Sequence, residues 1–258
     1  MFLLYGRARG TFNDPNVLGA FLVLPGLVVL QRVLAGRLSS VLGGGVLLLV
    51  MLAALFLSFS RGACALAALL LMGMTFLTSR SASERLRIAL IAIAGAVVVA
   101  ALVAALLSIG QVADLFHQRA TFEQSYDVGH FGRFGRYILG FQLALERPLG
   151  IGPLQFAQAF GSEDPHNSLL NAFMSGGWLA GFAFLTLTLV SVAKGFRFVF
   201  VRTPWQPTYH VIYAAYLGVV FESVVIDIDH WRHYFLILGV LWGLMALSRP
   251  YLAPAAPA

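Results

Sequence analysis

The sequence has few of the residues that build soluble domains, metal clusters or disulfide frameworks. Charged residues occupy 11% of its 258 positions, against roughly 25% in an ordinary soluble domain. Its one cysteine, Cys64, can form neither an internal disulfide nor a cysteine metal cluster. The sequence also has no Walker loop, no HExxH and no GxSxG. We therefore expect no disulfide framework and no nucleotide or other cofactor.

What the sequence has in excess is hydrophobic residues, which make up 59% of the chain and give a mean hydropathy of +0.84. The formal net charge is +6, and 16 of the 17 basic residues are arginine. In a soluble protein this balance indicates nucleic acid binding. Here the arginines are scattered between apolar runs. They are better suited to orienting the chain in a membrane and binding an anionic ligand, with membrane lipids and no nucleic acid as partners.

Seven apolar runs predict the architecture. A membrane-spanning helix needs about 20 mostly apolar residues, and lipid offers no partner to open backbone groups. The sequence therefore predicts an all-α fold, a polytopic transmembrane helical bundle that forms a single integral membrane domain over residues 1–258. The predicted spans cover residues 14–31, 39–57, 61–78, 88–109, 168–193, 208–226 and 231–248.

One long segment separates the fourth and fifth predicted spans, from residue 110 to residue 167. Basic residues gather after the first, third, fifth and seventh spans, which predicts that these ends are cytoplasmic. The long segment is then a loop on the outer side, which in a Gram-negative cell is the periplasm. Apolar residues at helical spacing over 112–126 predict an interfacial helix, and a second helix is expected over Arg136–Glu146. A structured loop of this length more often covers an active site or binding site than serves as a simple linker.

Arginines on the predicted outer side are candidate anion ligands. Arg61, at the mouth between two spans, either snorkels to lipid headgroups or presents a fixed cation to a cavity. Arg133 and Arg136 are three residues apart, so they share a face if a helix starts there. Guanidinium groups grip phosphate oxygens in bidentate fashion. The alternative is contact of an interfacial helix with headgroups.

A histidine just before the fifth predicted span is the candidate general base. Asn167 or Ser168 is expected to cap that helix, which places His166 at its N-terminus. The helix dipole there favours a neutral imidazole, the form that accepts a proton. The alternative is a surface histidine without a catalytic role.

Acidic residues near the outer end of the sixth span are the last candidates. Glu222 lies inside the span, so we expect it to pair with a cation or to line a cavity. Asp227 and Asp229 have an Asp-x-Asp spacing that holds a divalent metal in some glycosyltransferases. A solvated turn is the favoured interpretation of these two residues, and we predict no metal site.

Four stretches in this order carry a resemblance to a known family. They are Gly-Thr-Phe-Asn-Asp-Pro-Asn at 10–16, Ser-Arg-Gly at 60–62, Gly-Arg at 132–133 followed by Pro-Leu-Gly-Ile-Gly at 148–152, and His-Asn-Ser-Leu-Leu at 166–170 with glycines at 176, 177 and 181. Together they resemble the O-antigen ligase and O-antigen polymerase family of bacterial inner-membrane proteins, over residues 10–243.

The resemblance implies a metal-independent glycan transfer from undecaprenyl diphosphate to an acceptor on the outer face of the membrane. For a ligase the acceptor is the lipid A core, and for an O-antigen or exopolysaccharide polymerase it is another carrier-linked glycan. By motif, Arg61 and Arg133 take the diphosphate-binding positions and His166 the position that activates the acceptor hydroxyl. Arg136, at a position less consistently basic in the family, is added to the diphosphate-binding set.

Supporting roles and alternatives follow from the same residues. Asn167 and Glu222 are possible supporting residues of the site. Members of this family usually carry more spans than this sequence predicts, so the chain is expected to correspond to their C-terminal portion. A membrane transporter and a non-catalytic fragment are the more distant alternatives. A transporter would need charges deep inside several spans, and Glu222 is the main one.

Overall fold

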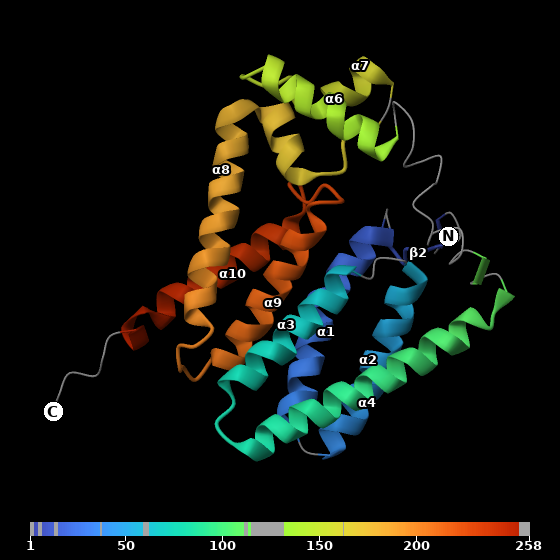
Figure 1. The fold of residues 1–258 in the computed structure, drawn as a ribbon, viewed down its shortest axis with the longest axis vertical. Helices are drawn as coiled ribbons and strands as arrows, with labels where there is room; N and C mark the ends of the chain where they lie inside the picture. Colours follow the sequence, from blue (N-terminus) through green and yellow to red (C-terminus); the bar gives the residue numbers. More distant parts are fainter. Residues whose placement is uncertain are drawn as a thin grey trace.

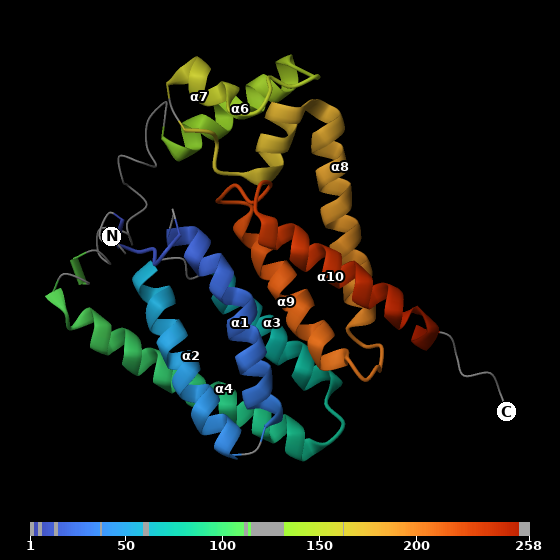
Figure 2. The same ribbon diagram turned by 180° about the vertical axis from the view of Figure 1, so that it is seen from behind.

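The computed structural model describes residues 3–4, 7–12, 15–36, 38–58, 62–110, 113–114, 132–161 and 163–252 (Figures 1 and 2). The described helices are α1 (Pro15–Ala35), α2 (Leu38–Ser58), α3 (Gly62–Thr78), α4 (Ala82–Leu107), α6 (Arg133–Glu146), α7 (Gln155–Phe160), α8 (Ser168–Phe198), α9 (Gln206–Glu222) and α10 (Arg232–Ser248), followed by the 3-10 turn η1 (Arg249–Leu252). The helical prediction is confirmed, with one addition at the N-terminus. There β1 (Leu3–Leu4) pairs antiparallel with β2 (Arg7–Ala8).

Five helical segments are long and apolar enough to cross a membrane. They are Val17–Ala35, Val41–Ser58, Ala82–Leu107, Ser168–Phe198 and Arg232–Leu252. The other two predicted spans correspond to α3 and α9, which are 17 residues long each. The structure therefore contains five candidate membrane spans, and the number seven stays a prediction.

Helix α9 lies at the centre of the bundle, where it packs against α1, α3 and α10. It buries residues on every side, among them Tyr209, Tyr213 and Tyr216. A helix that is apolar all round belongs in a core. Because it is surrounded by protein, α9 fixes the place of the loop that follows it, which is part of the candidate site described below.

Helix α8 is broken at Gly177, whose φ of 74° and ψ of −173° are not helical. Figure 1 shows the helix turning back on itself at this point. The segment before α7 forms hydrogen bonds with the backbone at this break. The N–H groups of Ile151 and Gly152 donate to the carbonyls of Met174 and Ser175 at 2.9 and 3.0 Å. Trp178 N–H in turn donates to Pro148 O at 2.9 Å. These bonds satisfy three of the backbone groups that the break leaves without helical partners.

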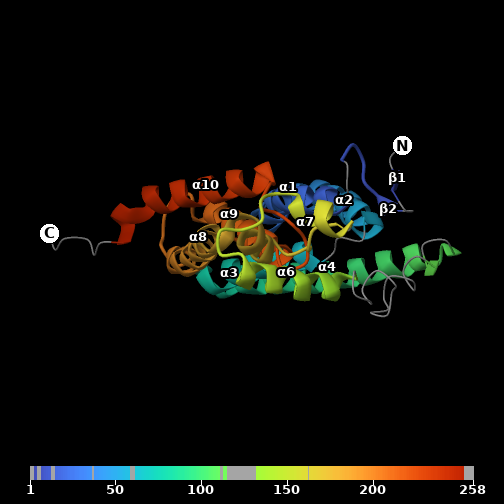
Figure 3. The ribbon, with the colours of Figure 1, turned by 90° about the horizontal axis from the view of Figure 1, so that it is seen from above.

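Helix α6 lies at the same end of the molecule as the turn of α8, against which it packs (Figure 3 looks down on this end). It contains the helix predicted over Arg136–Glu146 and begins three residues earlier. Its buried face carries Arg136, Gly140 and Ala144 at a spacing of four. A Cβ on Gly140 would lie 3.0 Å from Pro165 Cγ, so glycine lets α6 approach the turn before α8 closely. The interfacial helix predicted over 112–126 falls outside the described residues, except 113–114.

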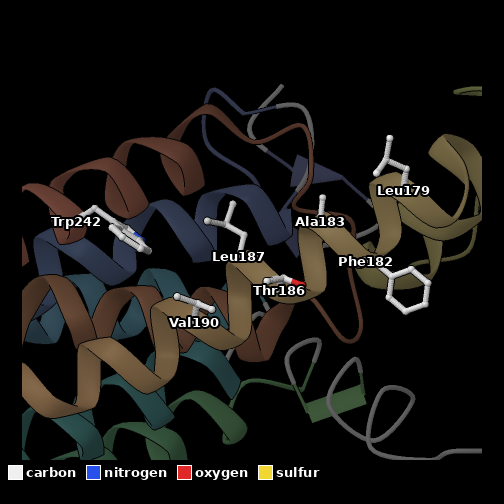
Figure 4. A pocket seen from close by; sticks show the side chains of 7 residues that line it. All are labelled: Leu179, Phe182, Ala183, Thr186, Leu187, Val190 and Trp242. Atoms are coloured by element: carbon white, nitrogen blue, oxygen red, sulfur yellow. The ribbon is translucent and has the colours of Figure 1, made fainter.

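An open apolar groove of about 480 Å³ runs along α8 (Figure 4). Its lining residues are Leu179, Phe182, Ala183, Thr186, Leu187, Val190 and Trp242. None of them is charged, and none belongs to the polar site described next. The groove is therefore not the place where a diphosphate would bind.

Candidate active site

His166 lies in the turn that leads into α8, next to the residue that caps this helix. Asn167 Oδ1 accepts a hydrogen bond from Leu170 N at 2.9 Å, as the sequence predicts for a cap. Asn167 Nδ2 donates to Val224 O at 3.1 Å, in the loop after α9. The cap therefore also joins the histidine turn to a segment far along the chain.

Ser168 provides the strongest connection between these two segments. Its side chain is fully buried. Its Oγ donates to Ile226 O at 2.9 Å and accepts from Ile228 N at 2.7 Å, while its own backbone N–H donates to Ser223 O at 2.9 Å. These bonds hold the loop over residues 223–231 in one position beside His166.

Asp227 is the residue of this loop that contacts the histidine. Its Oδ2 lies 3.4 Å from His166 Nδ1, and the two side chains are 15% and 27% exposed. Burial raises the pKa of the Asp227 carboxyl above its ordinary value, and the hydrogen bond with His166 partly opposes this rise. The favoured interpretation of residues 227–229 as a solvated turn is wrong for Asp227, because Ser168 holds the loop against α8.

The other ring nitrogen of His166 faces a second carboxylate. Glu163 Oε2 lies 3.4 Å from His166 Nε2 and 3.4 Å from Arg136 Nη1. The glutamate side chain is 69% exposed, whereas Arg136 is 3% exposed. His166 thus stands between two acidic side chains of different burial.

The Arg136 side chain is buried and forms hydrogen bonds with the turn before α8. Its Nη1 lies 3.3 Å from Glu163 O and 3.5 Å from Asp164 O, in addition to the carboxylate contact. Tyr137, the next residue along α6, donates its hydroxyl to His166 O at 2.7 Å. Neither Tyr137 nor Glu163 stands out in the sequence, because their contacts with His166 depend on the packing of α6 on α8 and on the fold of the turn before α8.

Asp229 has a different environment from Asp227. Its Oδ2 accepts from Asn171 Nδ2 at 2.8 Å, and Asn171 Oδ1 accepts from Ser175 Oγ at 2.9 Å. Its other oxygen lies 3.1 Å from His230 Nδ1. Among the residues that the structure describes, no group of three or more His, Cys, Asp or Glu side chains could hold a metal ion.

The remaining predicted site residues are only partly placed. Arg61 lies outside the described residues, and Arg133 begins α6 without a described side chain. Glu222 is buried at the C-terminal end of α9, directly before the loop that contacts His166. Of the predicted residues, the structure therefore brings together Arg136, His166 and Asn167.

Comparison with protein families gives one result. The family model described as O-antigen ligase matches residues 46–185, a little over half of the chain. The matched segment extends from α2 past the break in α8, and it includes the turn that carries His166. Comparison with curated proteins and with solved structures finds no match.

Proposed function

Because the chain belongs to the O-antigen ligase family, we propose that it transfers a glycan from undecaprenyl diphosphate to an acceptor such as the lipid A core. Membership of this family implies lipid-linked glycan transfer. The acceptor, the site residues and the independence from metal are the parts that the proposal adds.

The observation that carries the proposal is the pairing of His166 with Asp227. A carboxylate on Nδ1 orients the imidazole and leaves Nε2 as the atom that accepts a proton. In the proposed step the acceptor hydroxyl oxygen forms a bond to the anomeric carbon, and its proton passes to His166 Nε2. The bond from that carbon to the diphosphate oxygen breaks, and its electron pair leaves with the diphosphate.

Arg61, Arg133 and Arg136 are the proposed diphosphate-binding residues. Negative charge develops on the diphosphate as it leaves, and guanidinium groups held in place beforehand stabilise that charge. The contacts of Arg136 with the backbone at Glu163 and Asp164 support a second role, which is to hold the turn that carries His166. Arg133, three residues earlier on α6, starts the same helix.

Asn167 and Glu222 are the proposed supporting residues. Asn167 connects the turn of His166 to the loop after α9 through its bond to Val224. Glu222 ends α9 immediately before that loop. Both positions determine where Asp227 lies, so we expect their loss to reduce activity less than the loss of His166 does.

The proposed location is the inner membrane, with the site on the periplasmic face. Five helices that can cross a membrane support the membrane location, and the placement of arginines supports the orientation. In this arrangement the polyprenyl tail of the donor stays in lipid while its diphosphate reaches the polar end of the bundle.

We propose that no metal takes part, because the two carboxylates of the Asp-x-Asp spacing already have protein partners. Asp227 contacts His166, and Asp229 accepts from Asn171. Dialysis of the purified chain against EDTA should leave the rate of glycan transfer unchanged. Loss of transfer that added Mg²⁺ restores would refute this part of the proposal.

The function itself is tested by a lipopolysaccharide gel of a deletion strain complemented with this chain. A ligase predicts that the deletion removes all long glycan from the core and that the chain restores it. A single-repeat band on the core would identify a polymerase instead. An unchanged ladder in the deletion strain would refute glycan transfer to the core as the function.

A further inference from the structure

The carboxylate of Glu163 occupies a position that the proposed reaction needs. Its Oε2 lies 3.4 Å from His166 Nε2, whereas Asp227 contacts the other ring nitrogen, Nδ1. The same oxygen lies 3.4 Å from Arg136 Nη1. A general base must come within hydrogen-bond reach of the hydroxyl that it deprotonates. An oxygen atom at the position of Glu163 Oε2 nearly meets that condition.

We propose that the position of Glu163 Oε2 is the subsite for the acceptor sugar hydroxyl, and that Glu163 fills it until the acceptor displaces the carboxylate. This inference rests on the proposed function. The hydroxyl oxygen would stand between Nε2, which takes its proton, and Arg136 Nη1. The guanidinium group then stabilises the negative charge that develops on this oxygen as the proton leaves. Arg136 would thus act on the acceptor oxygen as well as on the turn.

The burial of Arg136 and of Glu163 fits an occupant that the acceptor can replace. Arg136 is 3% exposed and is held by backbone carbonyls, so it stays in place when Glu163 moves. Glu163 is 69% exposed, so its carboxylate can turn into water without uncovering a core. An ion pair whose carboxylate is exposed to water shifts an equilibrium by up to about fivefold. Glu163 therefore competes with the acceptor but does not block it.

The contact is tested without any need for glycan transfer. The probe is diethylpyrocarbonate, which modifies accessible neutral imidazole nitrogens, and mass spectrometry follows each histidine in the full chain held in nanodiscs. In Glu163→Ala the rate at His166 should rise by about twofold to fivefold, in line with the weakness of an exposed pair. His230, which is 71% exposed, is the internal reference and should react at an unchanged rate.

Two variants complete this design. Glu146→Ala removes an exposed glutamate at the end of α6 and should leave the rate at His166 at the wild-type value. Glu163→Gln keeps the size of the side chain but loses the charge that pairs with Arg136, so its rate should lie between wild type and Glu163→Ala. An unchanged rate at His166 in Glu163→Ala would overturn the proposal.

Transfer kinetics test the identity of the subsite. Glu163→Ala should lower the KM for the acceptor by up to about fivefold while kcat stays within about a factor of two, because only a competitor is removed. A loss of kcat of tenfold or more would overturn the proposal in favour of Glu163 as a proton carrier. If the wild type itself transfers no glycan, the proposed function fails, and the modification rates still decide whether Glu163 covers His166.

Discussion

Ser168 Oγ accepts a hydrogen bond from Ile228 N at 2.7 Å, across 60 residues of sequence. The serine opens α8, and the isoleucine follows the aspartate that contacts His166. Both residues are fully buried. This bond, with the one from Ser168 Oγ to Ile226 O, is what places a loop carboxylate beside a histidine from another part of the chain.

Ser168→Ala should therefore destabilise the protein and displace Asp227. The change leaves the buried N–H of Ile228 and the partly buried carbonyl of Ile226 without their partner, which costs about 1–3 kcal/mol. We expect a lower Tm in detergent and a reduced rate of transfer. Ser108→Ala is the control, because Ser108 is exposed and bonds only to a carbonyl of its own helix end among the described residues. Equal Tm values for the two variants would contradict the account.

Gly177→Ala should be among the most damaging glycine substitutions in the chain. Gly177 has a φ of 74°, and a Cβ there would collide with Pro148 O. This region of backbone conformation costs other residues about 1–3 kcal/mol, and the collision adds to that cost. Thermal unfolding should show a clear fall in Tm.

Gly43→Ala is the matched control for this change. Gly43 lies inside α2, and no described atom lies within 4 Å of its Cβ position. Alanine in a helix interior is favoured over glycine by about 0.5–1 kcal/mol, so we expect an unchanged or slightly higher Tm. A fall in Tm in Gly43→Ala as large as in Gly177→Ala would contradict the importance of the break in α8.

Asp227→Asn should change how stability depends on pH. Burial raises the pKa of Asp227, so the folded protein holds the proton of this side chain more tightly than the unfolded chain does. The stabilisation of the folded state that comes from this proton is fully present below the ordinary aspartate pKa of about 4. It is lost as the pH rises through the raised pKa of the folded protein. Asparagine does not ionise, so the variant avoids this loss.

The measurement is the difference in Tm between Asp227→Asn and wild type from pH 4 to neutral pH. We expect the difference to move in favour of the variant as the pH rises. Glu146→Gln, at an exposed position, should show a difference that does not change with pH. A constant difference for Asp227→Asn as well would mean that burial of this carboxyl has no effect on its ionisation.

Much of the fold follows from local sequence patterns. The apolar runs predict the helices that cross the membrane, and the polar residue before α8 predicts its cap at Asn167. Gly150 and Gly152 have φ values of 80° and 91°, a conformation that glycine adopts without strain. These features depend on residues that are near one another in the chain, so spacing and residue type are sufficient to indicate them.

The site depends on contacts that spacing does not encode. Asp227 approaches His166 because Asn167, Ser168 and Asn171 bind the loop after α9. The Asp-x-Asp spacing taken alone favours a solvated turn. Arg136 points inward because Gly140, one turn later, lets α6 approach the turn before α8. The break at Gly177 is also tertiary, since the backbone from Pro148 to Gly152 fills it.

The central claim is that His166 removes the proton of the acceptor hydroxyl, and single-turnover transfer by purified variants tests it most directly. His166→Ala should slow transfer from a lipid-linked donor by about 10²–10⁴-fold, the usual contribution of a general base, while the Tm stays close to that of wild type. His230→Ala, which removes an exposed histidine of the same end of the molecule, should transfer at the wild-type rate. Transfer by folded His166→Ala at a rate near that of wild type would contradict the claim.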